Sequence, residues 1–209
     1  MDRVRSGGAP LREIDRILGV LERYDQPGPR YTSYPTAVEF DTTYDEGLYR
    51  TKLADADAAS EEPLSLYVHL PFCAERCSYC ACNVVIARHG DVAARHLAYL
   101  HREVDLLAAA LPRRRRVSQY HWGGGTPTYL SVAQIRALHA HVTASFRIDP
   151  DAEVAIEVDP RVTTAEQMAA LRSLGFNRVS MGVQELAYLQ REVDLLAAAF
   201  RAGGCPYVC

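Results

Sequence analysis

The chain alternates short apolar segments with helical patterns, and this alternation constrains its fold more than any other feature. The apolar segments span residues 64–70, 117–122, 153–158 and 177–182, and helical patterns follow at about 91–111, 131–145, 164–174 and 186–201. Nearly continuous apolar strands joined by helices indicate a parallel sheet. Right-handed crossovers in series curl such a sheet toward a barrel. We therefore expect an α/β fold, a partial TIM-like (β/α) barrel of about four β/α units.

The segments on either side of this core have a different composition. Apolar residues at helical spacing over 11–21 predict one amphipathic helix, and residues 45–54 predict a second, shorter one. Between them, residues 26–35 are rich in Pro and Gly, which favours extended chain. These patterns predict three regions: an N-terminal arm at 1–60, a partial barrel at 61–184 and a tail at 185–209.

The bulk composition argues against several classes of protein. The 209 residues are 48% hydrophobic and 23% charged, which is typical of a globular domain. A net charge of −3 gives no reason to expect binding to nucleic acid or to an anionic membrane. The longest apolar stretch, 106–111, is too short to span a bilayer. The polar start of the chain does not resemble a secretory signal, so we expect a cytoplasmic protein with reduced thiols.

A run of four arginines at 113–116 follows a helical pattern and Pro112. Short runs of like charge are usually solvated, and cations suit the carboxyl end of a helix. We therefore expect a solvated loop here, with an anion-binding site as the alternative.

Four of the six cysteines lie within ten residues, in the sequence Cys73-Ala-Glu-Arg-Cys77-Ser-Tyr-Cys80-Ala-Cys82. The C-x3-C-x2-C spacing of the first three suits an iron–sulfur cube, which normally has four Cys ligands. With three ligands, one iron stays open for another ligand, and this separates a catalytic cluster from an electron carrier. A structural zinc site normally pairs two C-x2-4-C units, or Cys with His, and fits this spacing poorly. Plain buried thiols are the third alternative.

The loops after the second and third strands carry further candidate residues. Gly123-Gly124-Gly125 would let a ligand approach the backbone and offer it free N–H groups, and a tight turn is the alternative. Glu157 and Asp159 are two positions apart in a strand, so they should point the same way at the mouth of the barrel. Two carboxylates there suit recognition of a hydroxyl or an amine, with loop capping as the alternative.

The remaining candidates lie on the first and fourth strands. Tyr67 and His69 share one face of the first strand, and a packed, hydrogen-bonded histidine is the alternative to a catalytic one. Gln184 places a side-chain amide at the end of the fourth strand.

Several segments together resemble a known family. The C-x3-C-x2-C run after a first barrel strand resembles the radical S-adenosylmethionine superfamily. Over about residues 20–184 the chain resembles, within it, the oxygen-independent coproporphyrinogen III oxidases (coproporphyrinogen dehydrogenases). The segments that carry this resemblance are 28–37, 66–73, 80–83, 121–130, 156–161 and 175–184. The Tyr-Thr-Ser-Tyr-Pro sequence at 31–35 and the Cys80-x-Cys82 step argue against the related heme chaperones.

The resemblance implies cofactors and the residues that bind them. Cys73, Cys77 and Cys80 would hold a [4Fe–4S] cluster, whose open iron would bind one S-adenosyl-L-methionine molecule. Residues matching contacts to this first molecule are Tyr67, Gly124 and Glu157, and those matching contacts to a second molecule are Tyr79, Gly125, Thr126 and Gln184. Cys82 is not a cluster ligand in the family pattern. His69 and Cys82 are therefore candidates without an assigned catalytic role.

The same resemblance implies a reaction. An electron from a donor such as flavodoxin or ferredoxin would cleave the first S-adenosylmethionine to methionine and a 5′-deoxyadenosyl radical. The radical would remove a hydrogen from a propionate β-carbon of coproporphyrinogen III, and loss of carbon dioxide and one further electron would leave a vinyl group. Two rounds would give protoporphyrinogen IX for heme biosynthesis, with the protein orienting the reactants and excluding competing reactions. The alternative is a heme- or iron–sulfur-binding relative without oxidase activity.

The end of the chain departs from the family pattern. Family members are about twice as long, so we expect a fragment with little activity alone and an unpaired edge on the 177–182 strand. Residues 186–199 copy residues 97–110 except that Gln190 replaces His101. A match that occurs only twice indicates a duplication or junction, not a solenoid. Cys205 and Cys209 lie in this tail, and we assign them no role.

Overall fold

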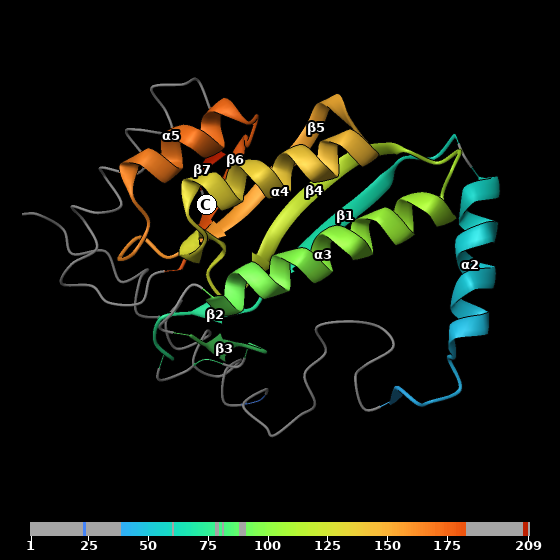
Figure 1. Cartoon of the computed structure of the whole chain (residues 1–209), viewed down its shortest axis with the longest axis horizontal. Helices are drawn as coiled ribbons and strands as arrows, with labels where there is room; N and C mark the ends of the chain where they lie inside the picture. Colours follow the sequence, from blue (N-terminus) through green and yellow to red (C-terminus); the bar gives the residue numbers. More distant parts are fainter. Residues whose placement is uncertain are drawn as a thin grey trace, which may run out of the picture. The chain divides into compact units, whose positions relative to one another are not determined.

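The computed structural model describes residues 23, 39–59, 61–77, 80, 82–87, 91–182 and 207–208 (Figure 1). The chain divides into two compact units, residues 1–45 and residues 46–209. In the first unit, the backbone N–H of Thr43 donates a hydrogen bond to Asp41 Oδ1 (2.8 Å). The predicted helix at 11–21 and the copied segment at 186–199 lie outside the described residues.

The second unit is built on a parallel sheet (Figure 1). Among the described residues, five strands follow one another across it in chain order: β1 (Leu64–Leu70), β4 (Arg116–Gly124), β5 (Arg147–Val158), β6 (Arg178–Met181) and β7 (Tyr207–Val208). Each neighbouring pair is parallel, which confirms the α/β architecture expected from the alternation of strands and helices. Because all strands run the same way, their carboxyl ends and the loops that follow lie at one edge of the sheet.

Helices cover one face of this sheet: α3 (Asp91–Ala110), α4 (Val132–Ser145) and α5 (Ala165–Ser173). The strand residues buried beneath them alternate along each strand and include Val68, Leu70, Tyr120, Trp122, Val154, Ile156 and Val158. In a strand, the residues between these positions point to the opposite face. That opposite face carries the polar side chains of the site.

Short-range signals set the ends of two helices. Ser131 caps α4 and Thr164 caps α5, and in both the side-chain oxygen of the Gln three residues later accepts a hydrogen bond from the backbone N–H of the cap residue. The Gln167 side chain also donates to the backbone carbonyls of Thr128 (2.7 Å) and Leu130 (2.8 Å). These bonds fix the loop after β4 against the start of α5.

Helix α2 (Glu46–Ala58) extends beyond the predicted 45–54 and belongs to the second unit, although the sequence placed it in an arm ending at residue 60. Its buried Asp57 accepts hydrogen bonds from the backbone N–H groups of Arg113 (2.8 Å) and Arg114 (3.0 Å) and from Arg113 Nε (3.0 Å). Burial would raise the pKa of Asp57, but these bonds outweigh it and lower the pKa. Asp57 thus ties α2 to the loop before β4.

The arginine run at 113–116 has structural partners, which corrects the expectation of a solvated loop. Arg114 donates to the backbone carbonyls of Ala56, Glu62 and Pro63. Arg115 donates to the carbonyl of Ser145 at the end of α4 (2.8 Å), and Arg116 pairs with Asp149 (2.9 Å). The run joins the carboxyl ends of α2 and α4 to the amino-terminal ends of β1, β4 and β5, away from the strand ends that carry the site.

The edge of β6 is partly covered. Arg178 and Val179 pair in parallel with Tyr207 and Val208 of β7. The sequence predicted an unpaired edge here, and that expectation is wrong for the first half of β6. The two residues of β7 carry no strong strand pattern of their own, so only their position beside β6 defines them as a strand.

Candidate functional site

The loops at the carboxyl ends of the strands enclose one cavity of about 790 Å³. Its walls include Cys73, Cys77, Cys80 and Cys82 from the loop after β1, Gly124, Gly125 and Thr126 from the loop after β4, and Glu157 and Asp159 from the end of β5. Segments far apart in sequence therefore meet where a parallel α/β sheet places its chemistry.

A small two-stranded sheet holds the cysteine loop at its two ends. Strand β2 (Phe72–Cys73) pairs with β3 (Val85–Ile86), and the backbone N–H of Ala87 donates to the carbonyl of Cys73 (3.1 Å). Inside the loop, the N–H of Cys80 donates to the carbonyl of Cys77 (3.1 Å). Both ends of the cysteine loop are thus anchored by the β2–β3 pair, and its thiols line the same cavity.

The thiols influence one another. Burial raises the pKa of Cys73, and the nearby Cys80, Cys77 and Asp159 add to the increase, while a contact with Thr126 Oγ1 (3.5 Å) opposes it. Burial and the neighbouring Cys80 and Glu157 likewise raise the pKa of Cys82. Metal binding to such thiols releases protons, because thiolates are the ligands. Among the described side chains, no three of His, Cys, Asp or Glu form a group that could hold a metal ion.

The glycines after β4 keep the space beside the thiols clear. A Cβ on Gly125 would lie 2.9 Å from Cys73 Sγ, and one on Gly123 would lie 2.9 Å from Glu157 Oε2. Gly124 has a φ of +119° and would place a Cβ 2.8 Å from the His69 ring. A bulky group bound to Cys73 needs this clearance, so the glycine loop fits a cluster held by the cysteine loop.

The backbone N–H groups of this loop are already occupied, which corrects the expectation that they are free for a ligand. Gly124 donates to Glu157 Oε2 (3.1 Å), Gly125 to the carbonyl of Leu70 (2.9 Å) and Thr126 to the carbonyl of Phe72 (2.8 Å). The loop is therefore anchored to β1 and β2. What it offers a ligand is space and carbonyl or side-chain groups.

The uncovered face of the sheet carries a chain of aromatic and acidic residues. Tyr67 Oη lies 3.2 Å from His69 Nδ1, and its ring stacks on His121 with centroids 5.7 Å apart. His121 Nε2 lies 3.5 Å from Glu157 Oε1. Burial and the nearby Glu157 and Cys82 raise the pKa of Tyr67. His121 was not predicted as a site residue, although its place between buried Tyr120 and Trp122 puts it on the face of the sheet opposite the described helices.

Glu157 and Asp159 have different surroundings. Glu157 accepts a hydrogen bond from Gly124 at one oxygen and lies 3.5 Å from His121 at the other, and its side chain remains 45% exposed at the cavity. Asp159 is bound by Arg161, whose Nη2 lies 2.6 Å from Oδ2 and whose backbone N–H donates to Oδ1 (3.0 Å). Asp159 therefore matches the loop-capping alternative, and Glu157 is the carboxylate available to a ligand.

Of the other predicted site residues, two lie at the cavity, one is held by its neighbours, and two lie outside the described residues. Thr126 is buried beside Cys73, and Cys82 is exposed at the cavity. His69 is fixed by Tyr67 and by the carbonyl of Asn83, which lies 3.4 Å from its Nε2. Tyr79 and Gln184 lie outside the described residues.

Comparison with known proteins identifies close relatives. The sequence pattern of the Radical SAM superfamily matches residues 67–195. Oxygen-independent coproporphyrinogen III oxidase of Escherichia coli (strain K12) is 45% identical over 175 residues, which is 84% of this chain and 37% of the relative. The enzyme of the same name from Pseudomonas aeruginosa is 46% identical over 168 residues, or 79% of this chain and 36% of the relative.

A solved structure is also similar. It is the coproporphyrinogen III oxidase of Escherichia coli, described as a radical SAM enzyme, with a TM-score of 0.78 and 39% identity over 90% of this chain and 44% of that chain. The chain thus spans less than half the length of these relatives.

Proposed function

Because this chain belongs to the radical SAM superfamily, we propose that it provides the cluster-binding and S-adenosylmethionine-binding part of an oxygen-independent coproporphyrinogen III oxidase. Such an enzyme acts by oxidative decarboxylation of coproporphyrinogen III to protoporphyrinogen IX. The observation that carries the proposal is that the three spaced cysteines, the glycine loop and Glu157 line the same cavity. In addition, the relatives that are 45% and 46% identical to this chain are named oxygen-independent coproporphyrinogen III oxidase.

Cys73, Cys77 and Cys80 would hold the [4Fe–4S] cluster. With S-adenosylmethionine bound, the cluster supplies one-electron cleavage of that molecule and hence a carbon radical able to remove a substrate hydrogen. Because the residues of the glycine loop have no Cβ atoms, the volume beside Cys73 stays open. Cys82, exposed at the same cavity, lies two positions after Cys80, the last of the three spaced cysteines, and is left as a free thiol.

Glu157 would bind the ammonium group of the first S-adenosylmethionine molecule. Charge-assisted hydrogen bonds of this kind are about twice as strong as neutral ones. Gly124 and His121 hold the two oxygens of Glu157, so the carboxylate is oriented before the ligand arrives. Tyr67, 58% exposed and stacked on His121, would flank the same molecule.

A second S-adenosylmethionine molecule would contact Tyr79, Gly125, Thr126 and Gln184. The backbone N–H groups of Gly125 and Thr126 already donate to β1 and β2, so these two residues would contact it through carbonyl or side-chain atoms. The substrate would be coproporphyrinogen III, the electron donor a flavodoxin or ferredoxin, and the compartment the cytoplasm. No helix in the described part of the chain is long and apolar enough to cross a membrane.

The 209-residue chain alone is expected to cleave S-adenosylmethionine slowly and to make little or no protoporphyrinogen IX. Hydrogen removal needs the substrate carbon held about 3–3.5 Å from the attacking atom. The relatives are more than twice as long as the matched segment, so we expect residues outside it to supply much of the substrate pocket.

The test is an anaerobic assay of the reconstituted, chemically reduced chain. Release of methionine from S-adenosylmethionine is expected, and Cys73→Ala should abolish it. A chain that carries four irons, binds heme and releases no methionine would contradict the oxidase assignment and support the heme-binding alternative. Efficient formation of vinyl product would contradict the view that this chain lacks essential parts of the pocket.

A further inference from the structure

Arg161 reaches from the loop after β5 to the cysteine loop after β1. Its Nη2 atom lies 3.8 Å from Cys77 Sγ, a hydrogen-bonding distance for sulfur. The same nitrogen donates to Asp159 Oδ2 (2.6 Å), and Nε donates to Asp159 Oδ1 (3.0 Å). Because Nη2 carries two hydrogens, one serves the carboxylate and the other is available to the thiol.

Asp159 holds this guanidinium in one orientation. The Asp159 side chain is 14% exposed, and a two-point pairing between Arg and a carboxylate restricts both side chains. An arginine guanidinium keeps its positive charge in proteins. The positive end of the pair is therefore directed at Cys77.

We propose that Arg161 is a positioning residue of the iron–sulfur cluster: it donates an N–H···S bond to the Cys77 thiolate and thereby raises the reduction potential of the cluster. This inference rests on the proposed function, since it takes Cys73, Cys77 and Cys80 as the cluster ligands. Reduction adds a negative charge to the cluster. Hydrogen bonds to ligand sulfurs and nearby positive charge favour that state, and both are known determinants of cluster potential.

A purely structural role for Arg161 is the competing explanation, because its pairing with Asp159 also closes the loop between β5 and α5. That loop has other bonds that do not use the guanidinium. Thr163 donates to the carbonyl of Asp159 through its side chain (2.7 Å) and its backbone N–H (3.1 Å). Thr163 Oγ1 also contacts Thr128 Oγ1 (2.7 Å), which anchors the loop to the segment after β4. Removal of the guanidinium should therefore leave the backbone in place.

The experiment measures the midpoint potential of the reconstituted 209-residue chain by an anaerobic redox titration followed by electron paramagnetic resonance, without S-adenosylmethionine. Arg161→Met keeps an aliphatic stem but removes the charge and the donors. Arg161→Lys keeps the charge without the planar fork. Arg147→Met is the control, because Arg147 is exposed at the opposite end of β5 and its substitution removes the same charge. Iron content is measured for every variant.

The expected result is a more negative potential for Arg161→Met at unchanged iron content, a smaller shift for Arg161→Lys and none for Arg147→Met. A wild-type potential in Arg161→Met with full iron content overturns the inference and leaves the proposed function standing. If Arg161→Met takes up little iron, Arg161→Gln is measured instead and judged by the same criterion. A wild-type chain that takes up no iron overturns both the inference and the proposed function.

Discussion

The Glu157 carboxylate accepts a hydrogen bond from the backbone N–H of Gly124 (3.1 Å), which joins the end of β5 to the end of β4. The other oxygen of the same carboxylate lies 3.5 Å from His121 Nε2. A carboxylate oriented by a backbone hydrogen bond loses less conformational freedom when a ligand binds, so more of the interaction energy contributes to affinity. This arrangement makes Glu157 the strongest candidate on the uncovered face for binding an ammonium group.

Glu157→Gln should weaken S-adenosylmethionine binding without loss of iron. The amide keeps an acceptor for Gly124 but lacks the negative charge. Loss of a hydrogen bond to a charged partner costs about 1.5–3 kcal/mol, which corresponds to roughly tenfold or more in affinity. Isothermal titration calorimetry on the reconstituted chain measures it. Glu153→Gln is the matched control, because Glu153 lies on the same face of β5 but pairs with Arg178 (2.8 Å). Equal affinities for all three proteins would leave Glu157 with only a structural role.

Gly124→Ala should destabilise the fold more than Gly175→Ala. Both glycines have positive φ, +119° and +91°, and a side chain in such a conformation costs on the order of 1–3 kcal/mol. At Gly124 the new Cβ would also lie 2.8 Å from the His69 ring, whereas no described atom lies within 4 Å of the position at Gly175. Urea denaturation gives both free energies of unfolding. Similar losses would mean that the His69 ring moves aside without cost.

Anaerobic reconstitution should give a brown protein with about four irons per chain, as a cube held by thiolates requires. Cys73→Ala, Cys77→Ala and Cys80→Ala should each abolish iron uptake, because each removes one of only three ligands. Cys82→Ala is the control in the same loop and should retain the iron. Iron and zinc analysis of the purified variants measures this. Tight zinc binding without iron uptake would refute the cluster.

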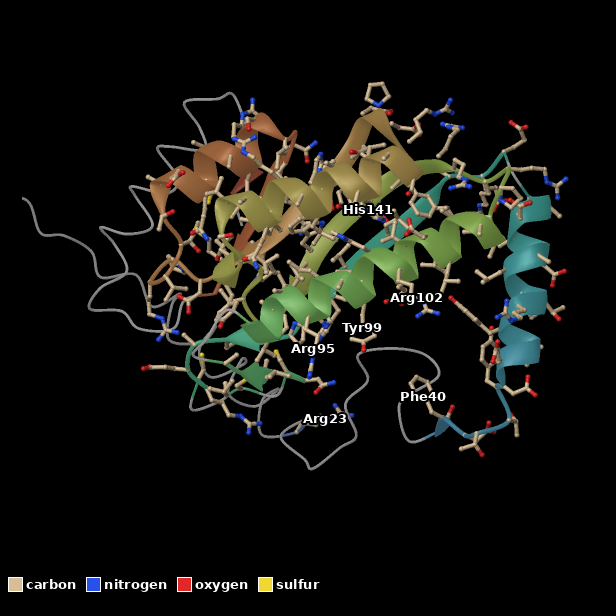
Figure 2. The ribbon with its side chains drawn as sticks, in the orientation of Figure 1. Arg23, Phe40, Arg95, Tyr99, Arg102 and His141 are labelled. Carbon is tan, nitrogen blue, oxygen red and sulfur yellow. The ribbon has the colours of Figure 1, made fainter. Side chains whose placement is uncertain are left out.

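The free energy of unfolding should fall as the pH is lowered through about 6.5. Burial lowers the pKa of His101, with His141 adding to the decrease and Asp105 opposing it, and burial alone lowers the pKa of His139. The His101 ring of α3 stacks on the His141 ring of α4, with centroids 4.4 Å apart. His141, labelled in Figure 2, places its Nε2 2.8 Å from Asp105 Oδ1. Within the described part of the chain, His101 Nε2 and His139 Nδ1 are buried without a hydrogen-bond partner.

The direction of this pH dependence follows from the lowered pKa values of His101 and His139. Well above pH 6.5 both histidines are neutral in the folded and unfolded chains, and neither makes stability depend on pH. As the pH falls below the ordinary histidine pKa of 6.5, the unfolded chain binds protons first and is favoured. If the unfolded chain binds one proton more than the folded chain, the free energy of unfolding changes by at most about 1.4 kcal/mol per pH unit. His101→Gln, which matches Gln190 in the copied segment, should flatten the dependence between pH 7.5 and 5.5. Urea denaturation across this range measures it, and an unchanged slope would contradict the assignment to His101.

Local patterns in the sequence were sufficient for the order of the elements. Strands and helices have different apolar periods, so the parallel α/β sheet was predicted, and helices α3, α4 and α5 agree with the predicted ranges to within a few residues. Strand β5 starts at Arg147, six residues before the predicted start at 153. The three-cysteine spacing is also a local property, and it identified the loop that lines the cavity. Strand β7 was missed, because two residues have no measurable period and become a strand only by pairing with β6.

The roles of individual site residues were decided by contacts between distant segments. Sequence alone could not tell that the N–H of Gly125 is used by Leu70, or that Asp159 is bound to Arg161 while Glu157 stays open to the cavity. It also could not show that Asp57 holds the arginine run or that His121 lies against Glu157. The sequence by itself determined which residue types lie at the strand ends. The tertiary structure decided which of their hydrogen-bonding groups remain free, because that depends on the register between strands and on side chains brought together from loops more than thirty residues apart.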